Sequence, residues 1–231
     1  MPKGIQNLAL VLLLVRTRNP SGEEEAAPGV LAGLRYIARD RIIRGVSLVV
    51  LLSGFWFPIL VVSIPAYAFL HGADPRVAGL LLFAFSAGTA IGSIVSYRAL
   101  ARVPPLRLAR FALIWIAASL CLVAMNLPTA AMAAVLGLGA LLVPSANAPA
   151  FTLLTLAPEG VRAKVTTAVL TLNTAVMPLG YLVGGLVISR LSVRTAFVIV
   201  AALGLLTAAV FWRVSTRAES VDPSLGSIPV S

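Results

Sequence analysis

The stretch "PLGYLVGGLVISRLSVR", residues 178–194, places one proline and three glycines in an otherwise apolar run. In water, glycine in a helix interior costs about 1 kcal/mol of stability relative to alanine. A helix that keeps these glycines must therefore gain stability from a surface without side chains. Lipid supplies such a gain, because apolar helices in a membrane associate through small residues that let their backbones approach closely. Gly180 and Gly184 have the GxxxG spacing of that packing. The stretch therefore predicts a membrane helix packed against a neighbour.

The composition of the chain also favours lipid as its solvent. Of the 231 residues, 59% are hydrophobic and only 11% are charged, whereas a soluble domain carries about 25% charged residues. The net charge of +10 would suggest nucleic acid in a soluble protein. Here the arginines flank long apolar runs, so we expect membrane lipid and not nucleic acid as their partner. The single cysteine, Cys121, rules out a disulfide framework within the chain.

The lengths of the apolar runs predict an all-α, polytopic membrane protein with six transmembrane helices. Crossing the hydrocarbon takes about 20 apolar residues. One run is far too long for a single span and should fold back at 126–129, where a proline and polar residues predict a turn. No run alternates with a period of two, which excludes a membrane barrel. The uncharged runs are 45–70, 77–97, 111–158, 165–189 and 195–212.

The distribution of basic residues predicts the orientation of these spans. Fourteen Lys and Arg residues fall on one side of the predicted membrane and three on the other. Because basic residues accumulate on the cytoplasmic side, we expect a cytoplasmic C-terminus in the plasma or inner membrane. The cytoplasmic loops would carry Arg98, Arg102, Arg162 and Lys164, and the opposite side would carry Arg76, Arg190 and Arg194.

The chain divides into four predicted segments. Residues 1–15 contain an apolar run too short to span, which we interpret as the truncated stump of a preceding helix. Residues 16–44 form a cytoplasmic linker whose second part, 29–44, has the pattern of an interfacial amphipathic helix. Residues 45–213 form the bundle, and residues 214–231 are predicted to be a disordered cytoplasmic tail.

Polar side chains inside the spans are candidates for contact with a solute, because their exposure to lipid is unfavourable. Asn147, on a span interrupted by Pro144 and Pro149, and Asn173 carry amides that their own helix cannot satisfy. For both, a structural hydrogen bond and a solute contact remain open. Ser86 and Thr89 can bond a carbonyl of their own helix instead, which is the more common arrangement.

Aromatic and small residues supply the remaining candidates. Phe55 and Trp56 lie in the middle of the first span, where they would either line a cavity for a bulky apolar solute or simply pack between helices. Gly88 and Gly92 repeat on the second span the four-residue spacing of Gly180 and Gly184, and we expect all four glycines to serve helix packing.

The spans contain no Asp, Glu, Lys or His. A proton relay inside the membrane needs such a group. The chain also lacks a metal-binding cluster, a Ser–His pair and a phosphate-binding glycine loop with its lysine. The sequence therefore predicts a protein that is not an enzyme and has no cofactor or metal site.

Four motifs resemble the C-terminal six-helix half of a major facilitator superfamily transporter. They are "GLRYIARDRIIRG" (33–45), "SAGTAIGS" (86–93), "APEGVRAKVTTAV" (157–169) and "MPLGYLVGGLVISRL" (177–191). The branch they resemble most contains bacterial exporters related to enterobactin and macrolide efflux proteins. The loop 97–111 keeps the arginines of the family's cytoplasmic gating motif but lacks its glycine and aspartate.

The resemblance implies two inverted three-helix repeats and alternating access around a midplane cavity. Such a mechanism needs a second six-helix bundle, either an N-terminal half or another copy of the chain, and a small-molecule substrate such as a drug or siderophore. The cavity would be lined by the asparagines, aromatics and hydroxyl residues named above. A non-transporting membrane scaffold, or an inert fragment of a transporter gene, remains the alternative.

Overall fold

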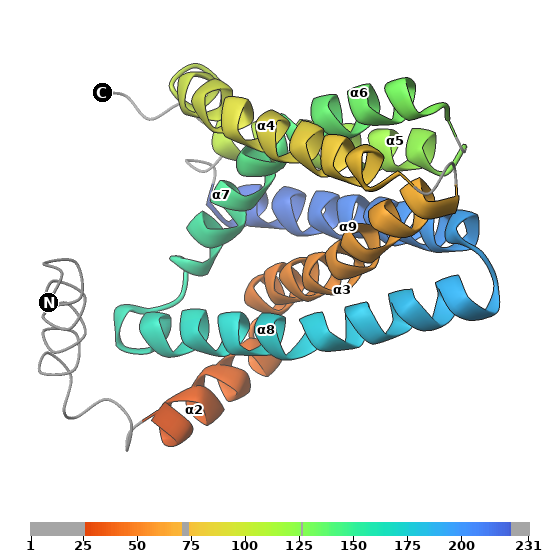
Figure 1. Ribbon diagram of the computed structural model, residues 1–231. Coiled ribbons are helices and arrows are strands. Elements are labelled where there is room, and N and C mark those ends of the chain that lie inside the picture. Colours follow the sequence, from red (N-terminus) through yellow and green to blue (C-terminus); the bar gives the residue numbers. More distant parts are fainter. Residues whose placement is uncertain (1–25, 71–73, 126, 223–231) are drawn as a thin grey trace, which may run out of the picture.

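The computed structural model describes residues 26–70, 74–125 and 127–222, and every regular element in those ranges is a helix. Six segments, with α6 and α7 together counted as one, are long and apolar enough to cross a membrane, which confirms the predicted all-α bundle (Figure 1). The predicted stump, 1–15, lies outside the described residues. The helices are α2 (Ala26–Arg39), α3 (Arg41–Leu70), α4 (Pro75–Leu100), α5 (Pro105–Val123), α6 (Thr129–Ala140), α7 (Val143–Leu154), α8 (Glu159–Arg190) and α9 (Val193–Val221).

Asp40 divides the interfacial helix that the sequence predicted over 29–44. Its carboxylate accepts hydrogen bonds from the backbone N–H groups of Ile42 and Ile43 at 2.8 and 2.9 Å. This is the geometry of a helix N-cap, which satisfies donors that the first turn leaves free. Residues 41–44 therefore belong to helix α3, and the single helix predicted over 29–44 was wrong.

Helix α2 packs on the bundle rather than standing apart from it. Ile37 is buried, and a Cβ on Gly33 would collide with the backbone carbonyl of Lys164 on α8. Burial raises the pKa of Tyr36, and the negative charge of Asp40 adds to the shift.

A stripe of small residues joins α4 to the span formed by α6 and α7. A Cβ on Gly88 would meet the carbonyl oxygen of Gly137, and one on Gly92 would meet the backbone of Leu141. One turn further on, the hydroxyls of Ser96 and Ser145 form a buried hydrogen bond of 2.5 Å. Helix α4 is thus in backbone contact with its neighbour over several turns.

A second stripe joins α8 to α3. A Cβ on Gly180 would meet the carbonyl oxygen of Phe55. One on Gly184 would lie 2.8 Å from Val62 Cγ2 and 3.1 Å from Ile59 Cα, which is closer than ordinary packing allows. These contacts are the close approach that the opening stretch of sequence predicts.

The two stripes are related by the order of the spans. Helix α4 is the second span and packs on the fourth, while α8 is the fifth span and packs on the first. The third and sixth spans, α5 and α9, pack on each other, where Gly204 faces Leu120. This exchange of partners is the pattern expected of two three-helix repeats.

The fourth span is interrupted next to Pro144. Proline has no backbone N–H, so it cannot bond the carbonyl of Ala140 four residues earlier. Helix α6 accordingly ends at Ala140, and α7 begins at Val143. The predicted interruption at Pro149 was wrong, since α7 continues through that residue.

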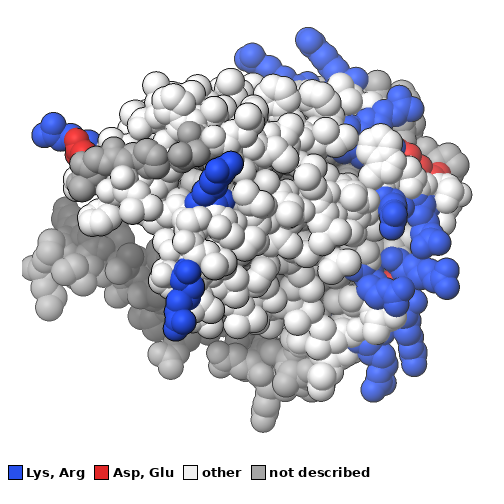
Figure 2. All heavy atoms as spheres, turned by 90° about the vertical axis from the view of Figure 1, so that its right-hand side faces the viewer, with Lys and Arg blue, Asp and Glu red and all other residues white. Residues whose placement is uncertain are grey.

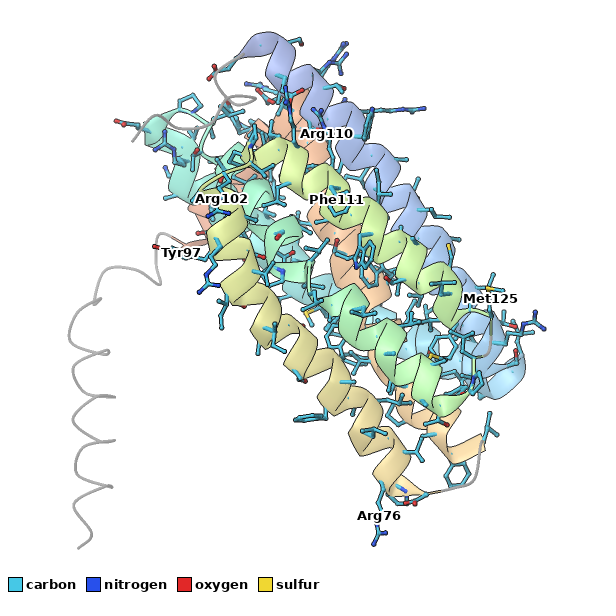
Figure 3. The ribbon with its side chains drawn as sticks, turned by 90° about the horizontal axis from the view of Figure 1, so that it is seen from above. Arg76, Tyr97, Arg102, Arg110, Phe111 and Met125 are labelled. Carbon is cyan, nitrogen blue, oxygen red and sulfur yellow. The ribbon has the colours of Figure 1, made fainter. Side chains whose placement is uncertain are left out.

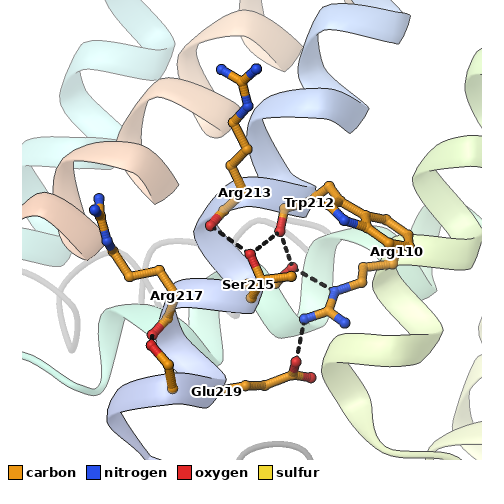
Figure 4. A network of polar contacts seen from close by, with 8 residues as sticks. Arg110, Trp212, Arg213, Ser215, Arg217 and Glu219 are labelled. Atoms are coloured by element: carbon orange, nitrogen blue, oxygen red, sulfur yellow. Dashed lines mark hydrogen bonds and ion pairs between the residues drawn. The ribbon is translucent and has the colours of Figure 1, made fainter.

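Helix α9 continues well beyond the last predicted span. A network around Arg110 on α5 holds it there, which makes the predicted disordered tail wrong over 214–221 (Figure 4). Arg110 donates hydrogen bonds of 2.6 Å to Ser215 Oγ and to the Glu219 carboxylate, and its guanidinium lies 5.4 Å from the centre of the Trp212 ring. Residues 223–231 lie outside the described residues.

Charged residues concentrate at the ends of the bundle. Figure 3 shows Arg102 and Arg110 at one end and Arg76 and Met125 at the other. In the face that Figure 2 presents, most Lys and Arg side chains gather along one edge, and a broad uncharged surface separates them from a few others. We call the end that carries Arg102 and Arg110 the basic end.

We expect Gly180→Ala to destabilise the bundle by about 1–3 kcal/mol, the range for overpacking a close contact. The added methyl group meets the Phe55 carbonyl oxygen, which is backbone and cannot move aside. Gly185→Ala is the matched control, because a Cβ there meets nothing within 4 Å. Thermal unfolding in one detergent compares the two variants, and equal melting temperatures would contradict close packing of α8 on α3.

We expect Glu219→Ala to destabilise the protein by about 1–2 kcal/mol, because it removes a charge-assisted hydrogen bond from Arg110. The loss should shrink as salt is raised, since ions screen partly exposed charges. Ser220→Ala serves as control, because the Ser220 hydroxyl bonds only the carbonyl of Arg217 in its own helix. The idea fails if both variants unfold at the same temperature at low salt.

Candidate functional site: an apolar cavity within the bundle

A cavity of about 320 Å³ lies among α3, α5, the α6–α7 span and α8, with one residue contributed by α4. Its wall is mostly aliphatic and aromatic. The interruption of the fourth span borders it, since both Ala140 and Val143 line the cavity. The break in the helix therefore helps to shape the cavity.

The cavity has an open side and a closed side. Asn147, Phe151 and Leu170, from α7 and α8, line it and are exposed. Ile116 and Leu120, from α5, line it and are buried. The cavity therefore extends from the surface between α7 and α8 toward the interior face of α5.

Two polar atoms at this cavity are buried and have no hydrogen-bond partner among the described residues. They are the indole nitrogen of Trp56 and the amide oxygen of Asn173, and both residues line the cavity. A Cβ on Gly54 would collide with that amide oxygen, so only glycine leaves room for it there. Unmade hydrogen bonds of this kind cost about 1–3 kcal/mol each, which makes these atoms notable.

Aromatic rings form one part of the wall. The ring centre of Phe57 lies 5.9 Å from that of Phe85 on α4 and 6.3 Å from that of Trp56, edge to face. These are favourable separations for aromatic pairs. The rings offer an apolar, aromatic part of the wall to a bound molecule.

The structure brings three of the six predicted cavity residues together: Asn147, Asn173 and Trp56. Phe55, Ser86 and Thr89 are not among the residues that line this cavity. Their predicted contact with a solute finds no support in this geometry.

Phe55, Ser86 and Thr89 lie outside the cavity wall for different physical reasons. Each helical residue is rotated by about 100° from the previous one, so Phe55 and Trp56 point in different directions. Thr89 donates a hydrogen bond of 3.0 Å to the carbonyl of Phe85 in its own helix, which is the alternative that the sequence left open. Ser86 is exposed on α4.

Of the four residues predicted to lie in cytoplasmic loops, only Arg102 lies between helices, whereas Arg98 lies in the last turn of α4 and Arg162 and Lys164 lie near the start of α8. None of the four lines the cavity. Arg98, Arg102 and Lys164 are exposed. Arg162 donates a hydrogen bond of 3.2 Å to the carbonyl of Ala157, across the turn before α8. The contact of Arg162 is local, and a part for these four residues in gating stays a prediction.

A row of threonines that was not predicted from the sequence lies beside the cavity. Thr167, Thr171 and Thr174 lie on the surface of α8 next to Leu170, which lines the cavity, and all three are exposed. Their spacing of four and then three residues puts them on one helix face. That periodicity was the signal that could have identified them.

The electrostatics of the cavity are simple. None of the described residues that line it is titratable, and within the described ranges no three His, Cys, Asp or Glu side chains are placed to hold a metal ion. A charged molecule would lose its hydration there without gaining an ion pair, which is costly. The cavity suits a neutral, largely apolar molecule.

Comparison with known proteins places the chain in a family. The model of the Major Facilitator Superfamily matches residues 46–227, which is most of the chain and all six spans. No curated protein and no solved structure gives a significant match. With its six apolar spans, its paired helix contacts and its internal cavity, this chain belongs to the Major Facilitator Superfamily, a family of membrane transporters.

Proposed function

We propose that the chain is one half of a secondary exporter of small amphipathic molecules, such as drugs or siderophores, of the enterobactin and macrolide efflux branch. The observation that carries this proposal is the apolar cavity whose open side carries the polar residue Asn147. Its wall suits an apolar body, and Asn147 offers hydrogen bonds to polar groups.

The open side of the cavity between α7 and α8, which we call the mouth, has polar surroundings that support a path for a solute on this face of the bundle. Asn147 and the three threonines on the surface of α8 are exposed polar groups within membrane-spanning helices. Polar groups at that depth usually face a bundle interior or a water-filled cavity rather than lipid. A second bundle opposite α7 and α8 would enclose such a cavity, and rocking of the two bundles would expose it to each side in turn.

The exposure of the spans supports the same partner. Helices α8 and α4 are the spans least buried within the bundle, and each carries large exposed side chains such as Phe83 on α4 and Leu182 on α8. Lipid covers some of this surface, and the proposed second bundle covers the side with the mouth. The partner is an N-terminal half or another copy of this chain.

We expect both chain ends of the bundle to face the cytoplasm, because the basic end carries most of the Lys and Arg residues. The test is labelling of intact cells with a membrane-impermeant maleimide, in a Cys121→Ala background. Ser189→Cys, near the opposite end, should react at once, and Ser220→Cys only after the cells are permeabilised. Both residues are exposed, so accessibility within the fold is matched. Reaction of Ser220→Cys in intact cells would reverse the orientation.

We expect Asn147→Leu to lower export about fivefold, which corresponds to one lost hydrogen bond of about 1 kcal/mol. The measurement is uptake of radiolabelled erythromycin and of enterobactin by everted vesicles in which crosslinking shows the chain paired with a second bundle. Ser93→Leu is the control, because Ser93 is exposed on α4 and bonds the carbonyl of Thr89.

The outcomes of this assay separate the proposed function from its alternative. Export of either probe that falls in Asn147→Leu and not in Ser93→Leu supports a transport path through the mouth. Absence of uptake of both probes by the paired wild-type protein would instead favour a non-transporting scaffold or an inert fragment.

A further inference from the structure

The cavity lies inside one bundle rather than between two. Buried residues of α5, among them Leu113, Ile116 and Leu120, form its inner wall. Residues of α3 and α6, such as Leu60 and Leu136, close its sides and are also buried. A molecule held against this wall is surrounded by helices of this chain alone, so its binding needs no second bundle.

The unpaired atoms at the cavity specify a hydrogen-bonding ligand. The indole nitrogen of Trp56 is a donor only, and it is buried without a partner in the described part of the chain. Asn173 presents an amide whose oxygen is likewise unpaired. The amide exposes a donor or an acceptor as it turns about its terminal bond, so it can adapt to the ligand, whereas Trp56 accepts only a ligand with an acceptor.

We propose that this cavity binds a neutral, mainly apolar molecule with a hydrogen-bond acceptor, which the Trp56 N–H holds, and that the Asn173 amide makes the second polar contact. The inference rests on the proposed function in one respect: it names the substrate class of the same cavity. Neutrality follows from the absence of titratable side chains among its described lining residues. An aromatic or aliphatic body follows from the rings of Phe57 and Phe85 and from the aliphatic inner wall.

Water alone is the competing occupant. A buried water needs two to four polar partners, and apolar cavities that lack such partners stay dry. Here the two unpaired buried atoms belong to Trp56 and Asn173, and the other polar side chains among the described lining residues are Ser53, Ser119 and Asn147 in a wall that is mostly apolar. An apolar molecule with a carbonyl or ether oxygen supplies both a hydrogen-bond acceptor and apolar contact with the wall. Water supplies only the acceptor.

The test uses the full chain in lipid nanodiscs and two probes of nearly the same shape. Benzophenone carries a carbonyl acceptor and crosslinks to nearby C–H bonds on illumination, and diphenylmethane replaces that carbonyl with a methylene group. Benzophenone adducts on α3 and α8 peptides are measured against concentration by mass spectrometry. Adducts on the outward face of α4, near Phe83 and Ile94, report partition into lipid, because both residues are exposed.

We expect labelling of the cavity peptides to saturate while labelling of the α4 face does not. Trp56→Phe should raise the half-saturating benzophenone concentration about five- to tenfold, the range of one neutral hydrogen bond. Asn173→Ala should raise it as well. Diphenylmethane should compete with equal inhibition constants in wild type and Trp56→Phe, which also shows that the variant is folded.

Trp115→Phe is the matched control. Trp115 is exposed on α5 and already donates a hydrogen bond of 2.9 Å to the carbonyl of Leu138, so its loss should leave benzophenone binding unchanged. The proposal is overturned if cavity labelling does not saturate. It is equally overturned if Trp56→Phe and wild type bind benzophenone with the same affinity, since water then accepts the hydrogen bond of the Trp56 N–H.

Failure of this inference and failure of the export proposal give different results. Saturable benzophenone binding by a chain that moves neither erythromycin nor enterobactin when paired would overturn export and leave the binding site. Export by the paired protein, with no saturable binding by the chain alone, would overturn the site within one bundle and leave export.

Discussion

Close backbone contact across small residues is the constraint on which this bundle depends. In lipid, apolar side chains gain nothing by leaving the solvent, so helices need another reason to associate. Gly88 and Gly92 supply it between α4 and the fourth span, and Gly180 and Gly184 supply it between α8 and α3. A side chain at these positions would meet backbone or closely packed neighbours, which makes the pairing of the spans specific.

The cavity is a consequence of that pairing. Two helix pairs are held at short range, while α5 approaches them through larger side chains such as Leu113 and Leu120. The fourth span cannot run straight past this region, because Pro144 interrupts its hydrogen bonds next to Ala140. The resulting space is mostly apolar, and the unpaired indole nitrogen of Trp56 and amide oxygen of Asn173 are the features of its wall that packing alone does not explain.

The ends of the bundle are held by polar contacts instead. Asp40 caps the first span, and Arg110 ties α5 to the last turns of α9 through Ser215 and Glu219. Ion pairs of this kind are sustainable near the membrane surface and costly in its centre. Polar contacts therefore stabilise the bundle near the membrane surface, and small-residue contacts stabilise it within the hydrocarbon. The central cavity is left free of charge.

The sequence by itself determined the class of fold and the positions of the spans, because run length and charge respond directly to the thickness of the hydrocarbon and to its exclusion of ions. It also identified the packing glycines, since their four-residue spacing is a local property of one helix. Three of the six proposed cavity residues line the cavity, but the sequence singled them out only as polar or aromatic residues in a span, and their contact with a solute stays a prediction.

Only the tertiary structure decided which side chains share a cavity. Phe55 and Trp56 are adjacent in sequence, yet just one lines it, because the rotation of α3 is set by its contact with α8. The structure also extended α9 past Trp212, because the residue that stabilises its last turns, Arg110, lies on another helix. Contacts between helices distant in the chain leave no periodic trace in the sequence, so neither result could be obtained from it.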